Sequence, residues 1–214
     1  MKGIKKLFAF VLSLALLQIV AIPAHARGTL LYWYCDTDEV AYMPSSINGS
    51  YFVYDHSGDE PEDIEFKTYF RNAVTTARNQ WNNTLPLNIV ETATRFNAKN
   101  FIHGGTYDQL KGIFEKLSRY NSGYTNSRPG TRIKTMNPYV IWCFESVGEM
   151  CVVERDDRVP DNYTKTALHE MGHLCGWLGH STQDTDVMYE SSSTVTTLTF
   201  RDKNQLKQIY DLYY

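Results

Sequence analysis

Three residues near the C-terminal end of the chain have the types and the spacing of a zinc site with its own base. His169 and His173 are four positions apart. On a helix their side chains would stack one turn apart on the same face, which is the separation that two imidazoles need to share one tetrahedral zinc ion. Glu170 would lie about 100° around such a helix from His169. Its carboxylate would then lie next to the metal without being a ligand, and we expect it to act as the general base.

Chance alone would place a His-Glu-x-x-His pattern in a chain of this composition about once in a hundred sequences. The simpler structural alternative is an amphipathic helix with surface histidines. Residues further along the chain argue against both, because Gly176, His180 and the pair Met188-Tyr189 follow shortly afterwards. Cysteine ligands are set aside, since no two of the four cysteines have the short spacing of a zinc knuckle.

A helix that begins just after Pro160 must carry these residues, with Asp161 or Asn162 as its predicted N-cap. Its side chains form two stripes. The stripe suited to packing on a sheet contains Thr164, Leu168, Met171 and Cys175. The stripe suited to face a cleft contains Thr166, His169 and His173.

Hydrophobic periodicity predicts the elements around that helix. A long amphipathic helix is predicted over residues 64–81 and a second helix over residues 107–120. Residues 121–131, rich in Asn, Ser, Gly and Pro, predict a loop. Strands are predicted at residues 39–43, 51–54, 85–92, 100–103 and 139–144.

Two further patterns predict a terminal helix and a hairpin. Thr199 and Asp202 predict a capping pair for a terminal helix. The buried face of that helix is predicted to contain Leu206, Ile209, Leu212 and Tyr213. A turn at residues 146–148 would join residues 139–142 to residues 152–153 in a hairpin.

The first residues have the pattern of a secretory signal. Three lysines precede an apolar run over residues 7–22, and residues 24–26, Ala-His-Ala, fit the small-x-small pattern that signal peptidase cleaves. The apolar run is short for a membrane-spanning helix. We therefore expect residues 1–26 to be removed and residues 27–214 to form one domain without a membrane anchor. We expect the protein to be secreted, or periplasmic in a Gram-negative bacterium.

The charge balance gives no reason to expect nucleic acid or anionic membrane as a partner. The formal net charge of the 214 residues is −3. Loss of the three signal lysines would leave 18 basic against 24 acidic side chains, a net charge of −6. A mildly acidic surface does not attract polyanions. At this length we expect a monomer with a single hydrophobic core.

Export would make disulfides possible among Cys35, Cys143, Cys151 and Cys175. Cys143 and Cys151 are the favoured pair, because they flank the expected hairpin turn. A bridge between Cys35 and Cys175 is the weaker expectation. The alternative for Cys175 is a buried free thiol.

The motif His169-Glu-x-x-His173-x-x-Gly176, followed by a histidine and Met188, resembles the metzincin clan of zinc peptidases, and the matrixins most of all. The similar region runs from about residue 162 to residue 213. The resemblance implies an α+β fold, in which a mixed twisted β-sheet is combined with a long helix in the N-terminal half, an active-site helix and a C-terminal helix. It also implies one catalytic Zn²⁺ ion and a protein or peptide substrate for a catalytic domain over residues 27–214.

The resemblance also assigns roles to the residues after the helix. Gly176 would turn the chain sharply in a left-handed conformation, which costs glycine little. Met188 would form an apolar floor beneath the zinc ligands without binding the metal. The third ligand of the family would fall on Gly179, which has no side chain.

We therefore expect residues 177–179 to contain a one-residue bulge, so that His180 becomes the third ligand. The separation of eight residues between His180 and Met188 supports this reading, because an insertion before His180 leaves the downstream spacing intact. If His180 is not the ligand, Asp184 or Asp186 is the nearest carboxylate substitute. Glu190 replaces the proline that usually follows the methionine and tyrosine, so the family's specificity pocket does not carry over.

These residues predict a secreted zinc endopeptidase. Three neutral histidines would leave zinc a fourth position for a water whose pKa falls to about 7, and Glu170 would take its proton as it attacks the substrate carbonyl. One alternative is a zinc-binding module of peptidase fold that acts as an adhesion or inhibitor-binding protein, against which the presence of Glu170 argues. Another is a thermolysin-like enzyme with Glu190 as third ligand, against which Gly176 and the spacing to Met188 argue.

Overall fold

The apolar spacing of residues 64–81 produces the long helix α2 (Pro61–Asn82). Its first residue is a proline, whose missing N–H costs nothing in the first turn. The backbone N–H of Glu60 donates to Asp63 Oδ2 at 3.3 Å across the helix start. The buried face consists of Phe66, Phe70, Ala73, Val74, Ala77 and Trp81. The predicted amphipathic helix is therefore confirmed, with three further residues at its N-terminal end.

The computed structural model describes residues 30, 32–44, 49–127, 130–136, 139–143, 148–155, 159–191 and 194–213. Residues 32–214 form one compact unit. The expected signal segment, residues 1–26, and most of the expected hairpin turn lie outside the described residues. Within the described ranges, no helix has the length and the apolarity that crossing a membrane requires.

A five-stranded sheet with the strand order β3-β2-β4-β8-β5 supports the helices. Its four parallel strands are β2 (Ser50–Asp55), β3 (Val90–Glu91), β4 (Asn100–Gly105) and β8 (Glu149–Val153). The fifth strand, β5 (Gly123–Asn126), runs antiparallel to β8 at one edge of the sheet. The sheet is therefore mixed, as the family resemblance implied.

A second sheet has three strands. In it β1 (Glu39–Tyr42) lies parallel to β7 (Tyr139–Cys143), and β6 (Thr131–Met136) lies antiparallel to β7. The predicted hairpin between residues 139–142 and 152–153 is wrong, because β7 and β8 belong to different sheets. Apolar residues on both sides of a turn signal favour a hairpin locally. Here β7 pairs instead with β1 and with the preceding strand β6, whereas β8 pairs with β4 and β5.

The same separation explains why the expected disulfides are absent. All four cysteines are free thiols. Cys143 ends β7 in the three-stranded sheet, whereas Cys151 lies in β8 and packs with Leu110, Phe114 and Leu117. Cys175 is buried without a bridge. The pairing of Cys143 with Cys151 is corrected, and the alternative of a buried free thiol holds for Cys175.

The two remaining long helices each follow a local start signal. Helix α4 (Pro160–Leu174) begins at its proline with Val159 as N-cap, so neither Asp161 nor Asn162 caps it. Helix α5 (Phe200–Tyr213) has the predicted capping pair, since Thr199 N–H donates to Asp202 Oδ2 at 2.9 Å and Asp202 N–H donates to Thr199 Oγ1 at 3.2 Å.

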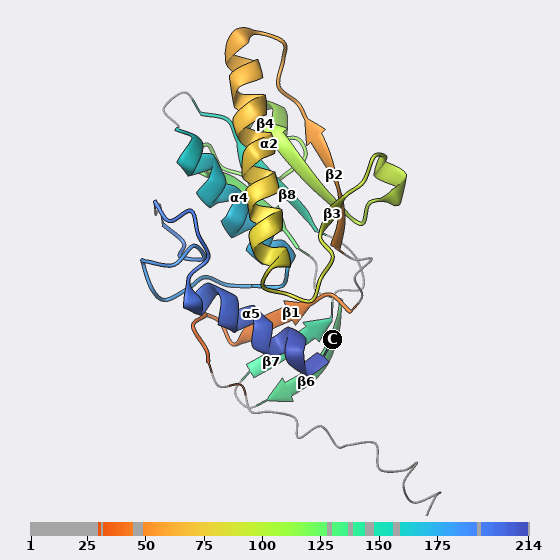
Figure 1. Cartoon of the computed structure of the whole chain (residues 1–214), viewed down its shortest axis with the longest axis vertical. Coiled ribbons are helices and arrows are strands. Elements are labelled where there is room, and N and C mark those ends of the chain that lie inside the picture. Colours follow the sequence, from red (N-terminus) through yellow and green to blue (C-terminus); the bar gives the residue numbers. More distant parts are fainter. Residues whose placement is uncertain are drawn as a thin grey trace, which may run out of the picture. The chain divides into compact units, whose positions relative to one another are not determined.

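Figure 1 shows α2 and α4 side by side over the five-stranded sheet, and α5 over the three-stranded sheet. The indole N–H of Trp81 in α2 donates to the carbonyl oxygen of Leu168 in α4 at 3.0 Å, which joins the two helices in the core. The hydroxyl of Tyr210 in α5 donates to the Cys175 carbonyl oxygen at 2.8 Å. Helix α4 is thus held by α2 near its middle and by α5 at its C-terminal end.

Three predicted elements differ from the structure. The helix expected over residues 107–120 is a single turn, α3 (Tyr107–Leu110), followed by tight turns. Its apolar residues Leu110, Phe114 and Leu117 are nevertheless buried, so the periodicity indicated burial and not a continuous helix. The strand expected over residues 85–92 shrinks to β3. A short 3-10 turn, η2 (Arg95–Asn97), follows β3.

The third difference is β5, which lies in the segment predicted to be a loop. Asn, Ser and Gly have low intrinsic strand preference. Pairing with β8 overrides that preference, with Tyr124 opposite Cys151 and Thr125 opposite Met150. Gly123 permits the close packing, since a Cβ there would lie 2.7 Å from the Cys151 carbonyl oxygen and 2.8 Å from Glu170 Cγ. Strand β5 therefore lies directly against the helix that carries the motif.

Candidate metal centre and active site

Helix α4 places two of the motif's histidines on one face. The ring centroids of His169 and His173 are 4.7 Å apart, and their Nε2 atoms are separated by 3.1 Å. His169 is buried and His173 is half-buried. The i, i+4 spacing therefore places the two rings side by side on one helix face, as expected.

The chain leaves α4 through a glycine turn. Gly176 has a φ of +116°, and a Cβ there would lie 2.0 Å from the carbonyl oxygen of Ala41. Only a residue without a side chain fits both the backbone conformation and this close approach to β1. The N–H of Ala41 donates to the Gly176 carbonyl oxygen at 2.8 Å, which fixes the turn against the strand.

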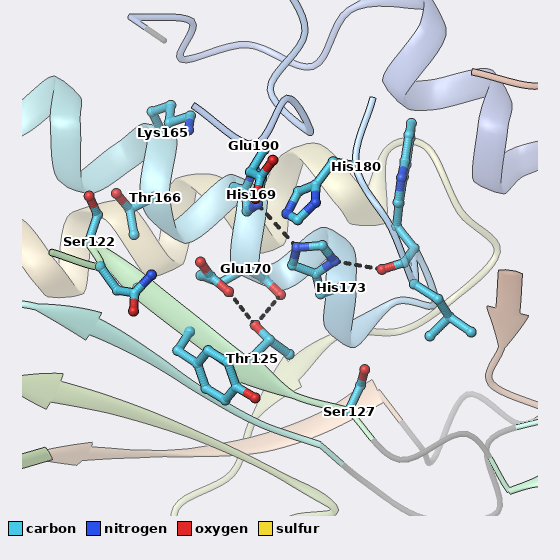
Figure 2. Close-up of a pocket in the computed structure, with 15 residues that line it drawn as sticks. Ser122, Thr125, Ser127, Lys165, Thr166, His169, Glu170, His173, His180 and Glu190 are labelled. Carbon is cyan, nitrogen blue, oxygen red and sulfur yellow. Dashed lines mark hydrogen bonds between the residues drawn. The ribbon is translucent and has the colours of Figure 1, made fainter. Parts of the chain in front are cut away.

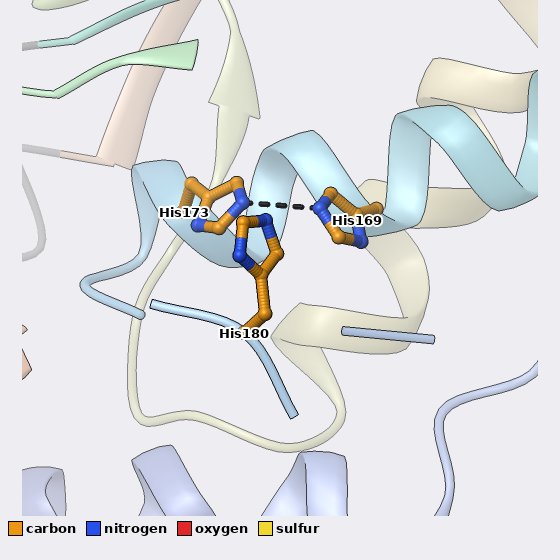
Figure 3. A group of neighbouring side chains, drawn as sticks. All are labelled: His169, His173 and His180. Atoms are coloured by element: carbon orange, nitrogen blue, oxygen red, sulfur yellow. Dashed lines mark hydrogen bonds between the residues drawn. The ribbon is translucent and has the colours of Figure 1, made fainter. Parts of the chain in front are cut away.

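The turn brings His180 back to the other two histidines. Its ring centroid lies 5.3 Å from that of His169 and 5.2 Å from that of His173. One ligand atom from each of the three side chains lies within 4.8 Å of the others. Figure 3 shows the three rings turned toward one shared space. His180 lies one position later than the usual family spacing of the third ligand. It is nevertheless the residue that the fold brings to the other two histidines.

Hydrogen bonds fix the proton positions on two of the rings. His169 Nδ1 donates to the Val187 carbonyl oxygen at 2.8 Å, and His173 Nδ1 donates to the Trp177 carbonyl oxygen at 2.6 Å. A carbonyl oxygen can only accept, so each Nδ1 carries the proton and each Nε2 presents a lone pair. Burial lowers the pKa of His169 well below its usual value and that of His173 to about 4, which keeps both rings neutral.

The donor set fits a zinc ion. Two lone pairs 3.1 Å apart repel each other unless a cation lies between them. Two imidazole nitrogens bound at about 2.0–2.1 Å to a tetrahedral zinc would be about 3.4 Å apart, which is close to the observed separation. The third imidazole, from His180, lies beside the gap between them (Figure 3).

Glu170 lies buried beside this cluster. Its Oε2 accepts a hydrogen bond from the hydroxyl of Thr125 in β5 at 2.6 Å, and its backbone carbonyl oxygen lies 3.0 Å from the same hydroxyl. Burial raises the pKa of Glu170 to about 7, although the hydrogen bond from Thr125 and the charge of Lys165 act in the opposite direction. A carboxyl group with a pKa near neutrality is suited to exchange protons.

The three histidines and Glu170 line one open cleft of about 380 Å³ (Figure 2). One wall is residues 121–125, which include the first three residues of β5, and the opposite wall includes Lys165 and Glu190. The ammonium group of Lys165 donates to the backbone carbonyl oxygen of Ser191 at 3.2 Å. The cleft is thus bounded by a sheet edge on one side and by α4 with its following loop on the other.

Met188 lies beneath the metal-facing helix. Its side chain is fully buried, and a Cβ on Gly172 would lie 2.3 Å from its sulfur. The Met188 carbonyl oxygen accepts a hydrogen bond from the N–H of Ser181 at 2.7 Å. This bond joins the chain at Met188 to the residue that follows His180. Asp202 accepts from the N–H groups of Val187 at 3.0 Å and Met188 at 3.1 Å. Helix α5 thereby supports the carbonyl that orients His169.

The carboxylates weighed as substitute ligands have other partners or lie apart. Asp186 is buried and accepts hydrogen bonds from Ser181, Thr199 and Arg201. Neither Asp184 nor Glu190 joins the group of possible metal ligands within the described residues. Glu190 stands on the cleft wall instead.

Sequence reasoning missed Thr125. The segment Gly-Tyr-Thr-Asn does contain an aromatic residue next to a β-branched residue, and both types are common in strands. Neighbouring turn formers outweighed that signal. Nothing in the local sequence indicates that this strand would lie against α4, since that contact depends on the pairing of β5 with β8.

Comparison with known proteins agrees with this geometry in the C-terminal part of the chain. The family model described as Matrixin matches residues 135–213. The matched residues include all of α4, the glycine turn, His180, Met188 and α5. Comparison with curated proteins gave no match.

A solved structure titled "Structure of myroilysin" is similar to this chain, with 14% sequence identity and a TM-score of 0.43. The alignment covers 76% of this chain and 93% of that chain. The family match thus makes residues 135–213 similar to the matrixins, and the rest of the chain lies outside that match.

Proposed function

We propose that this chain is a secreted zinc endopeptidase in which His169, His173 and His180 hold the metal and Glu170 is the general base. The observation that carries the proposal is the cleft itself. Two imidazole lone pairs converge there with a third imidazole, and a buried carboxyl group lines the same cleft. A metal centre with an adjacent base can activate a water molecule for hydrolysis.

Zinc held by three neutral histidines supplies a Lewis acid and lowers the pKa of a water at the site to about 7. The residues of this chain do the remaining work. Glu170 takes a proton from the attacking water and returns it to the leaving amine. The hydroxyl of Thr125 holds the Glu170 carboxylate in one orientation. Val187 and Trp177 keep two of the imidazoles in the tautomer that offers Nε2.

The edge position of β5 supports a peptide as the substrate. An edge strand has unpaired N–H and C=O groups, to which an extended peptide can add as a further strand. Strand β5 lies at the end of the five-stranded sheet and lines the cleft. A peptide paired there would pass over the histidines and could extend in both directions, which favours an endopeptidase.

The test compares Glu170→Gln with Glu190→Gln, a matched change on the same cleft wall. We expect Glu170→Gln to retain one zinc per chain and to lose casein hydrolysis by at least about a hundredfold, the usual range for a general base. Glu190→Gln should retain both zinc and most of the activity. Casein cleavage by Glu170→Gln at the wild-type rate would remove the assigned base. A wild-type protein that binds zinc and cleaves no peptide would instead be the non-catalytic module.

Export is proposed on the sequence alone. Residues 1–26 would be the signal segment and residues 27–214 the catalytic domain. Expression of the full chain in a secreting host followed by N-terminal sequencing of the exported protein tests this, and a new N-terminus at Arg27 is the expected result. Recovery of the protein only inside the cell, with Met1 retained, would contradict it.

A further inference from the structure

The three imidazoles differ in what orients them. His169 and His173 each donate from Nδ1 to a backbone carbonyl within or just beyond the motif. His180 has a different neighbour, because its Nδ1 lies 4.0 Å from Oδ2 of Asp36. This distance is longer than a hydrogen bond, and it places a carboxylate charge beside the ring.

A short segment far from the motif in sequence fixes the backbone around His180. The segment is residues 34–37, which we call the strap. The N–H of His180 donates to Asp36 Oδ1 at 2.7 Å, and the N–H of Asp36 donates to the His180 carbonyl oxygen at 2.8 Å. The N–H of Thr182 donates to the Tyr34 carbonyl oxygen at 2.9 Å, and Cys35 pairs with Ser181 in an antiparallel bridge. The strap therefore holds residues 180–182 from one side.

The glycine before His180 is explained by the same contact. A Cβ on Gly179 would lie 2.2 Å from Asp36 Oδ1, 2.7 Å from Thr37 Cγ2 and 2.9 Å from Cys35 Sγ. Any side chain at this position would push the strap away. The position where a ligand would stand in the usual family spacing is thus occupied by the residue that lets Asp36 approach.

We propose that Asp36 is a positioning residue for His180, and that docking of the strap completes the metal centre. This inference rests on the metal site of the proposed function. Loss of a residue that supports a ligating imidazole from behind typically weakens metal binding by about 10- to 100-fold. Asp36 supports His180 by its charge at 4.0 Å from Nδ1 and by the hydrogen bond that it accepts from the His180 N–H. The two hydrogen bonds between Asp36 and the His180 backbone together fix the position of the His180 main chain.

The experiment measures zinc affinity directly, by competition between the purified metal-free protein and a chromophoric chelator. Asp36→Ala removes both the charge and the hydrogen bond that Asp36 Oδ1 accepts from His180 N–H, and we expect it to weaken zinc binding by about 10- to 100-fold. Asp36→Asn keeps an oxygen that can accept from His180 N–H, so its loss should be smaller. Asp38→Ala removes an exposed acidic side chain two residues away and should bind zinc like the wild type.

Gly179→Ala supplies an independent test, because it keeps Asp36 and displaces the strap. We expect it to weaken zinc binding to a similar extent as Asp36→Ala. Thermal unfolding of the metal-free proteins checks that each variant folds. If Asp36→Ala does not fold, the zinc affinity of Asp36→Asn is compared with that of the wild type instead. Wild-type zinc affinity in a folded Asp36→Ala protein would overturn this inference and leave the proposed function intact. A wild-type protein that binds no zinc would overturn the proposed function itself.

Discussion

The hydroxyl of Thr125 lies 2.6 Å from Oε2 of Glu170, in a contact between an edge strand and the helix that carries the histidines. The same hydroxyl lies 3.0 Å from the Glu170 carbonyl oxygen. A hydroxyl has one proton, and the shorter distance assigns it to the carboxylate. Strand β5, which forms one wall of the cleft, is therefore also the element that orients the proposed base.

Removal of this hydroxyl should slow the chemical step. Thr125→Val keeps the shape of the side chain and loses its hydrogen bond to a charged group, a contact worth about 1.5–3 kcal/mol. We expect kcat for peptide hydrolysis to fall by about 10- to 100-fold while KM changes little. Thr125→Ser restores the hydroxyl and should recover most of kcat. Equal loss in both variants would indicate a packing role and no positioning of Glu170.

The identity of the third ligand can be tested by zinc content. His180→Ala removes one of three imidazoles, and we expect the zinc bound per chain after dialysis to fall sharply. Asp184→Ala and Asp186→Ala address the carboxylates that the sequence left open, and elemental analysis of each should find close to one zinc. Unchanged stoichiometry in His180→Ala would move the third ligand elsewhere.

Met188 should contribute to stability by filling the space beneath α4. Met188→Ala removes a fully buried side chain and should reduce the free energy of unfolding by about 2–5 kcal/mol. Met188→Leu keeps the volume and should cost less than about 1.5 kcal/mol. Denaturant unfolding of the metal-free proteins measures both. A cost for Met188→Ala as small as that for Met188→Leu would contradict the packing role.

The network around Asp186 should make stability depend on pH in the acid range. Burial by itself would raise the pKa of Asp186, but hydrogen bonds from Arg201, Ser181 and Thr199 lower it on balance. A carboxyl whose pKa is lower in the folded than in the unfolded state stabilises the fold above its unfolded pKa of about 3.9. That stability is lost as the pH falls through the folded pKa.

Asp186→Asn isolates this contribution from that of its neighbour Asp202, whose pKa burial raises. We expect the stability difference between wild type and Asp186→Asn to be constant above about pH 5 and to shrink below about pH 4. Urea unfolding at a series of pH values gives the comparison. A difference that does not change down to pH 2 would show that Asp186 does not titrate as the network requires.

Local sequence was sufficient where the signal lies within one helix. The i, i+4 spacing of His169 and His173 determines that their rings share a face, because the helix repeat is set by the backbone alone. The periodicity of α2 and the reciprocal caps at Thr199 and Asp202 were readable for the same reason. The left-handed turn at Gly176 was also predictable, since few other residues adopt it without strain.

Pairings between distant segments were not readable in this way. The sequence predicted a hairpin between β7 and β8 and a loop at β5, and both predictions are wrong because strand partners are chosen by the packed fold and not by neighbouring residues. The expected Cys143–Cys151 bridge failed with the hairpin.

His180 stands between these two cases. The sequence by itself determined a helix with two imidazoles and a base, followed by a glycine turn and a late histidine that the spacing to Met188 favoured as the third member. Only the tertiary structure decided where that histidine lies, because its position depends on the turn against β1 and on the strap, whose Asp36 is separated from it by 144 residues. Helix geometry is fixed by contacts within four residues, whereas the position of His180 is fixed by hydrogen bonds that only the folded chain can make.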